Sequence, residues 1–203
     1  MKKWLLCMSL VTGLGFTLSG QAQLVGDRVA GKTKAMACMG CHGADGNSVQ
    51  SSFPKLAGQG QAYLVKQLQD YQNGHRQNDV MVTMVASLSQ QDMVDIAAFY
   101  ASNTTTIESM TDVGELGQRI YNAGNRESGI PACKACHGPG GKGIPAAKWP
   151  ALAGQHSAYS QLQLAAFANG QRSNDPNSMM RDIARRLTPE ELTAVSDYTA
   201  TLE

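Results

Sequence analysis

The chain has 203 residues, enough for one or two domains, and its 17 Lys and Arg nearly balance its 16 Asp and Glu. The formal net charge of +1 comes without a basic stripe, so we expect no nucleic-acid partner. Aromatic residues make up only 6% of the chain, which predicts a thin core if side chains alone must fill it.

The first 22 residues have the pattern of a secretory signal peptide. Lys2 and Lys3 form a positive start, residues 4–18 are apolar, and residues 20–22 offer a small-x-small cleavage site. The apolar stretch is short of the about 20 residues that a membrane span needs, although an uncleaved anchor is an alternative. Cleavage would leave 15 Lys and Arg against 16 Asp and Glu, a formal net charge of −1. We therefore expect a periplasmic protein, with peripheral membrane association as an open alternative.

The pattern Cys-x-x-Cys-His occurs twice, at residues 38–42 and at residues 133–137. Two thiols at this spacing can reach the two vinyl groups on one edge of a porphyrin, and the next residue places an imidazole against the iron. Each copy therefore predicts a covalently attached haem c, and two such macrocycles would fill the thin core. The predicted attachment cysteines and iron-binding histidines are Cys38, Cys41, His42, Cys133, Cys136 and His137.

Two other interpretations of the paired cysteines explain less of the sequence. A zinc site would need both pairs to converge on one metal and would leave both histidines without a role. A thioredoxin-like redox motif needs neither a histidine after the second cysteine nor a second copy. The fifth cysteine, Cys7, lies in the expected signal peptide, so no thiol remains for a disulfide framework or a catalytic nucleophile.

A longer repeat surrounds the two motifs. Residues 53–79 and residues 149–175 align without gaps and are identical at 14 of 27 positions, which indicates a duplicated unit rather than one domain with two sites. We expect domain 1 at residues 23–102, a linker at residues 103–112 and domain 2 at residues 113–203.

The pattern inside each unit is helical, and no segment alternates as a strand would, so the expected fold class is all-α. Opening helices are expected at residues 27–37 and 113–125, and a further helix at residues 63–71. Ser89 and Thr188 have the sequence of N-caps for the last helix of each unit. The inner face of the helix after Ser89 is expected to be Met93, Ile96, Ala97 and Tyr100.

The remaining histidines are poor candidates for the second ligand of each iron. His75 aligns with Gln171 in the repeat, and His156 aligns with Gly60, so neither position is shared. A duplicated haem unit should carry its ligand at matching positions. We therefore expect His75 and His156 to be surface residues.

Methionines meet the same test better. Counting back seven residues from Leu88 and Leu187, which precede the two N-caps, gives Met81 and Met180. A thioether is a soft ligand for haem iron, so these two methionines are the predicted distal ligands. The runners-up, whose counterparts are not methionines, are Met84 and Met179.

A proline follows each haem motif at nearly the same distance. Pro54 lies twelve residues after His42, and Pro150 lies thirteen residues after His137. A ligating imidazole usually donates its other N–H to a fixed acceptor, often a backbone carbonyl. The proline carbonyls could be these acceptors, but a proline that merely starts a helix would explain the spacing equally well.

With these features the chain resembles the cytochrome c4 family of dihaem cytochromes, in which two class I cytochrome c domains are fused in tandem. The resemblance covers nearly the whole expected mature chain and is carried by CMGCHGADGNS, FPKLAGQ, CKACHGPGGKG, WPALAGQH, MMRDIARRL and LSQQDMVDIAAFYAS. It implies His/Met ligation at both irons and supports Pro54 and Pro150 as acceptors. It also implies electron transfer in the periplasm between a cytochrome bc complex or another donor and a terminal oxidase.

Two strong axial ligands leave no open position on the iron for a substrate, so we expect an electron carrier rather than an enzyme. One alternative is the haem subunit of a flavocytochrome dehydrogenase complex, which would differ only in its docking surface. The other is a dihaem enzyme, such as a peroxidase or a thiosulfate-oxidising cytochrome, which would need a vacant or displaceable ligand.

Overall fold

The computed structural model describes residues 25–110 and 113–203, where every regular element is a helix apart from two isolated β-bridges. The expectation of an all-α fold is therefore confirmed. The expected signal peptide lies outside the described residues. None of the described helices is both long and apolar enough to cross a membrane.

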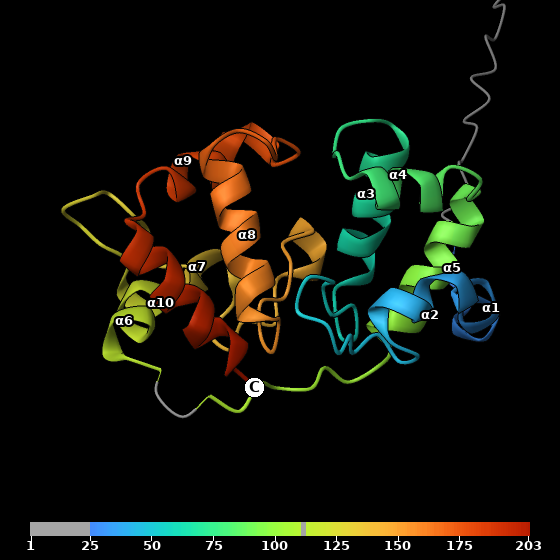
Figure 1. The fold of residues 1–203 in the computed structure, drawn as a ribbon, viewed down its shortest axis with the longest axis horizontal. Helices are drawn as coiled ribbons and strands as arrows, with labels where there is room; N and C mark the ends of the chain where they lie inside the picture. Colours follow the sequence, from blue (N-terminus) through green and yellow to red (C-terminus); the bar gives the residue numbers. More distant parts are fainter. Residues whose placement is uncertain (1–24, 111–112) are drawn as a thin grey trace, which may run out of the picture.

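The helices form two similar sets that lie side by side, with α3 and α8 facing each other (Figure 1). The first set is α1 (Arg28–Lys34), α2 (Met36–His42), α3 (Gln61–Gln72), α4 (Asp79–Val85) and α5 (Gln90–Ala101). The second set is α6 (Glu115–Ala123), α7 (Lys134–His137), η1 (Pro145–Ala147), α8 (Ser157–Ala168), η2 (Pro176–Ser178), α9 (Met179–Ala184) and α10 (Pro189–Ala200).

The last helix of each set begins where the sequence predicts. The Ser89 and Thr188 side chains each accept from the backbone of the third helical residue, and each forms a capping box. The expected opening helix at 27–37 is wrong in extent, because α1 ends at Lys34 and a second helix runs on to His42. The break lies at Ala35, which is fully buried.

Within each set the first helix crosses the last one, α1 against α5 and α6 against α10. A Cβ atom added to Gly31 would lie 2.0 Å from the Asp95 carbonyl oxygen. A Cβ added to Gly117 would lie 2.0 Å from the Ala194 carbonyl oxygen. Glycine is therefore required at both crossings, because the two backbones are in contact.

Each half has its own apolar cluster, and an attachment cysteine packs against each one. Cys38 lies beside the cluster of the first half and Cys133 beside that of the second. The predicted inner face of α5 is confirmed, since all four of its residues are at most 3% exposed: Met93, Ile96, Ala97 and Tyr100.

The contact between the halves uses equivalent residues of the repeat. The Gln59 side chain donates to the Ala151 carbonyl at 2.9 Å and accepts from the Ala151 N–H at 2.8 Å. Gln155, which aligns with Gln59, makes the same pair of bonds with the backbone of Lys55, both at 2.9 Å. The two glutamines thus form a nearly symmetric pair of bridges.

A second reciprocal contact joins α3 and α8 through two buried arginines. Arg76 and Arg172 are each 8% exposed and also align in the repeat. Neither guanidinium forms an ion pair with a carboxylate of the described ranges. Arg76 donates to Gln67, Tyr159 and Gln163. Arg172 donates to Tyr63, Gln67, Gln163 and Asn174.

Candidate haem sites

The two motif histidines end α2 and α7 and are buried, with exposures of 6% for His42 and 8% for His137. The Nδ1 atom of each ring lies 2.9 Å from a proline carbonyl, that of Pro54 or that of Pro150. A carbonyl can only accept, so Nδ1 carries the ring proton and Nε2 keeps its lone pair. The predicted proline acceptors are therefore confirmed.

The surroundings of both imidazoles favour the neutral form that binds metal. Burial lowers the pKa of His42 and of His137, and the contact with the proline carbonyl only partly opposes this effect. A ligand histidine must offer an unprotonated nitrogen, and its other N–H is usually held by an acceptor. Both rings meet these two conditions.

The motif thiols are unpaired with one another. All four described cysteines are free and half-buried: Cys38, Cys41, Cys133 and Cys136. Burial raises the pKa of Cys38, and it raises that of Cys133 to about 11. The Cys38 and Cys133 thiols therefore lie in apolar surroundings beside the two clusters, which suits attachment to an apolar macrocycle.

The methionines of the first half differ in exposure. Met81, in the first turn of α4, is half-buried, whereas Met84 is 38% exposed. The Asn78 side chain caps α4 and accepts directly from the Met81 N–H at 3.0 Å. The cap thus fixes the backbone that carries Met81.

In the second half, a carboxylate holds the segment that carries Met180. Met180 is half-buried and Met179 is 36% exposed. The Asp175 carboxylate accepts from the Arg181 backbone N–H at 3.0 Å and from Arg181 Nε at 2.7 Å. Burial of Asp175 opposes its ionisation, but these contacts with Arg181 outweigh burial and hold its pKa below the usual value.

The second half has three extra residues immediately before Met179. Asp175 lies 96 residues after Asp79, but Met180 lies 99 residues after Met81. The added residues are those of η2, and two of them, Asn177 and Ser178, have positive φ angles of 52° and 60°. The two methionines thus occupy similar helices that are entered by different turns.

The expectation for the other two histidines is half right. The side chain of His75 is 70% exposed, as expected. His156 is only 6% exposed, so the expectation that it is a surface residue is wrong. It lies where the start of α8 packs against the first half, and a comparison of the two repeats cannot detect a residue that serves the contact between them.

The donor set of each half fits a haem c. Each provides two thiols at the required spacing, an imidazole whose Nε2 lone pair is free, and a half-buried thioether on a following helix. Thioether attachment with His/Met ligation uses these groups and no others from the protein.

The sequence of this chain is similar to those of known cytochromes. The family model for cytochrome c matches residues 29–104 and 114–203. Cytochrome c4 of Pseudomonas aeruginosa is 43% identical over 196 residues, covering 95% of this chain and 96% of that protein. The thiosulfate dehydrogenase electron acceptor of Stutzerimonas stutzeri strain A1501 is 41% identical over 171 residues, covering 82% of this chain and 79% of that protein.

A solved structure agrees over both halves. The crystal structure of reduced recombinant cytochrome c4 from Pseudomonas stutzeri superposes with a TM-score of 0.85 at 39% identity, covering 88% of this chain and all (100%) of that one. Together with the matched family model and relatives, this places two covalently bound haem c groups in the protein. The chain belongs to the cytochrome c4 family and is a dihaem electron-transfer cytochrome.

Proposed function

We propose that the protein carries electrons in the periplasm, from a cytochrome bc complex or another donor to a terminal oxidase, without catalysing a reaction of its own. The bound haem c supplies the Fe(III)/Fe(II) couple. The observation that carries the proposal is the duplicated donor set, in which a neutral buried imidazole and a half-buried methionine are available in each half. Ligation from both sides would leave no iron position open to a substrate.

The roles of the chain's own residues follow from this arrangement. We assign haem attachment to Cys38 and Cys41 in domain 1, residues 23–102, and to Cys133 and Cys136 in domain 2, residues 113–203. His42 and His137 are assigned as proximal ligands, each oriented by its proline carbonyl. Met81 and Met180 are assigned as distal ligands, supported by their greater burial relative to Met84 and Met179.

Replacing each methionine by alanine tests the ligand assignment. Met81→Ala and Met180→Ala should each remove about half of the weak Fe–S(Met) absorption band of the ferric protein and lower one of the two reduction potentials, because Met/His ligation raises the potential. Met84→Ala and Met179→Ala serve as matched controls and should keep the whole band. Survival of the full band in both Met81→Ala and Met180→Ala would show that the assignment is wrong.

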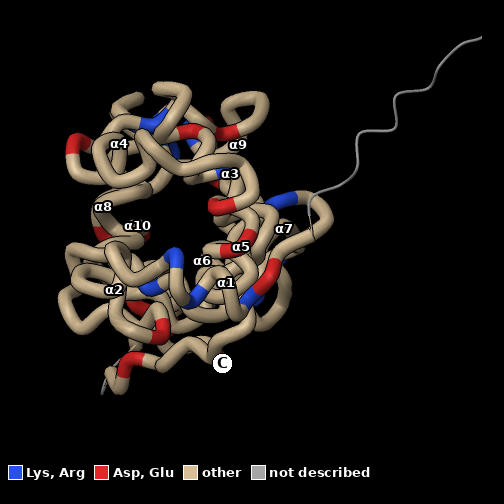
Figure 2. The backbone as a smooth tube through the Cα atoms, turned by 90° about the vertical axis from the view of Figure 1, so that its right-hand side faces the viewer, with Lys and Arg blue, Asp and Glu red and all other residues tan. Residues whose placement is uncertain are grey.

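A thiosulfate dehydrogenase is a second candidate electron donor, because one relative of this chain is named as the electron acceptor of such an enzyme. Lys and Arg positions are interspersed with Asp and Glu positions along the backbone in Figure 2, so the distribution of charged residues along the chain does not favour one class of partner. Stopped-flow reduction of the ferric protein by a quinol-fed cytochrome bc complex and by a thiosulfate dehydrogenase would rank the two donors. The relatives do not favour a flavocytochrome subunit or a dihaem peroxidase.

Export is tested with the full chain. Haem-loaded protein should be recovered from the periplasmic fraction, and a variant that lacks residues 1–22 should stay in the cytoplasm without covalent haem. Recovery of the intact chain in washed membranes would instead indicate an anchor.

A further inference from the structure

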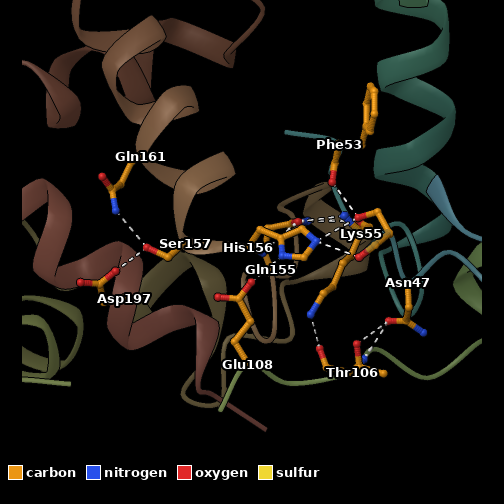
Figure 3. A network of polar contacts seen from close by, with 11 residues as sticks. Asn47, Phe53, Lys55, Thr106, Glu108, Gln155, His156, Ser157, Gln161 and Asp197 are labelled. Carbon is orange, nitrogen blue, oxygen red and sulfur yellow. Dashed lines mark hydrogen bonds and ion pairs between the residues drawn. The ribbon is translucent and has the colours of Figure 1, made fainter. Parts of the chain in front are cut away.

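His156 is a buried ionisable group to which we assign no part in haem attachment or ligation. Its side chain lies at the contact between the two halves, at the N-cap of α8 (Figure 3). The ring Nδ1 contacts the Glu108 carboxylate. The ring Nε2 lies 2.9 Å from the Ser48 carbonyl oxygen and 3.0 Å from Ser48 Oγ.

The partners of the ring determine how many protons it carries. A backbone carbonyl only accepts hydrogen bonds, and so does an ionised carboxylate. Ser48 Oγ uses its one proton to donate to the Phe53 carbonyl at 2.7 Å, so it too presents a lone pair to Nε2. Both ring nitrogens of His156 therefore face acceptors.

A neutral imidazole has one N–H and one bare nitrogen. In either tautomer the bare nitrogen would face an oxygen lone pair in a buried site, which is unfavourable. We infer that His156 is held as an imidazolium that donates from both nitrogens, and that it acts as a positioning residue that fastens the two domains together.

The charges around the ring fit this assignment. Glu108 provides the opposite charge on one side of His156. Lys55 Nζ is directed away, donating to the Thr106 carbonyl at 2.7 Å, and Asp197 of α10 is engaged by Ser157 (Figure 3). The partial positive charge at the start of α8 opposes a cation there, and the Glu108 contact offsets it.

The imidazolium joins three separate parts of the chain. Ser48 belongs to the loop after α2, Glu108 to the segment between the halves, and His156 to the start of α8. Losing one proton removes a hydrogen bond to a charged group, which changes the opening equilibrium of the contact by roughly tenfold or more. Any effect of this contact on electron exchange between the halves rests on the proposed function. The protonation state of His156 does not depend on that function.

Nitrogen NMR of the ferrous holoprotein tests the protonation state without any substitution. With two imidazoles assigned to iron, His75 and His156 remain, and the exposed His75 is an internal reference in the same spectrum. We expect both nitrogens of His156 to carry protons at neutral pH, because each faces an acceptor. A single N–H on His156 under these conditions would overturn the inference.

Hydrogen exchange tests the fastening role. The Lys55 and Ala151 amides, which bridge the halves, should lose about tenfold in protection factor as His156 loses its proton, whereas the Ile96 amide inside α5 should not. In His156→Gln the protection of the two bridging amides should be low and independent of pH, and His75→Gln should behave as the parent protein. Protection in the parent protein that does not change with pH would contradict the role, whether or not the protein transfers electrons.

Discussion

At His42 and His137, one proline carbonyl accepts from Nδ1 and the other ring nitrogen is left bare. At His156, both nitrogens face acceptors. At His75, most of the ring is in solvent. We therefore assign this side chain as a ligand, a cation or a surface group according to the atoms that lie opposite its two nitrogens.

Asn78 holds the backbone of Met81, a proposed haem ligand. Asn78→Ala removes the cap of α4 and should lower the free energy of unfolding by about 1 kcal/mol, as measured by urea denaturation. The Fe–S(Met) band of the first half should also be lost at a lower temperature, because the cap holds the Met81 backbone. Gln77→Ala, which removes only a contact with the Gly74 carbonyl, is the control, and equal effects of the two substitutions would contradict the role of the cap.

Among the elements, α1 and α5 cross with their backbones in contact. Gly31→Ala places a methyl group 2.0 Å from the Asp95 carbonyl, so one helix must shift. We expect a loss of about 1–3 kcal/mol or more in the free energy of unfolding, the usual cost of overpacking.

Gly40→Ala is the matched control for this crossing. Beyond the adjoining residues and the backbone of α2, no atom lies within 4 Å of the added Cβ, and the equivalent residue of the second motif is already Ala135. It should be neutral or stabilise by up to about 1 kcal/mol through helix propensity. A loss of stability in Gly40→Ala as large as that in Gly31→Ala would rule out the steric explanation.

An ion-pair cluster fastens the same two helices and predicts sensitivity to acid. Lys34 of α1 contacts Asp92 at 2.8 Å and Asp95 at 2.6 Å on α5. Lys34, together with Ser89, lowers the pKa of Asp92 to about 2. Burial opposes ionisation of Asp95, but the Asp27 N–H and Lys34 outweigh it and lower its pKa.

Both carboxylates therefore have folded-state pKa values below the unfolded value of about 3.9, so they stabilise the fold above that pH. This contribution is lost as the pH falls from about 4 towards 2, and thermal unfolding followed over that range should show it. Asp95→Asn should flatten the profile, while Asp182→Asn, whose side chain is 56% exposed, should leave it unchanged. The same slope in Asp95→Asn and the parent protein would contradict the assignment.

Across the whole molecule, equivalent residues of the duplicated unit meet at the contact between its copies. Gln59 and Gln155 each bind the backbone opposite, and Arg76 and Arg172 share the acceptors Gln67 and Gln163. His156 lies outside this symmetry, because Gly60 occupies the matching position.

Removing one arginine tests how strongly the halves depend on each other. Arg172→Ala removes the hydrogen bonds that Arg172 donates to Tyr63, Gln67, Gln163 and Asn174, and should cost about 2 kcal/mol or more in the free energy of unfolding. Haem absorbance should then report two unfolding transitions where the parent protein shows one. Arg185→Ala, whose side chain is 54% exposed, should have little effect, and equal stabilities of the two variants would contradict the prediction.

The sequence alone determined the cofactor, its number, the duplication and the starts of the last helices. Each depends on residues close together along the chain: five in a haem motif, four in the capping box that begins at Ser89 or Thr188. The same reasoning identified Pro54 and Pro150 as candidate acceptors, because only twelve or thirteen residues separate them from their histidines.

Only the tertiary structure decided the break at Ala35, the glycine crossings and the burial of His156. Each depends on atoms that the chain brings together from far apart, such as Gly31 with Asp95 or His156 with Ser48. Periodicity and motif spacing describe one segment at a time, whereas steric contact and proton count at a buried site depend on what lies opposite.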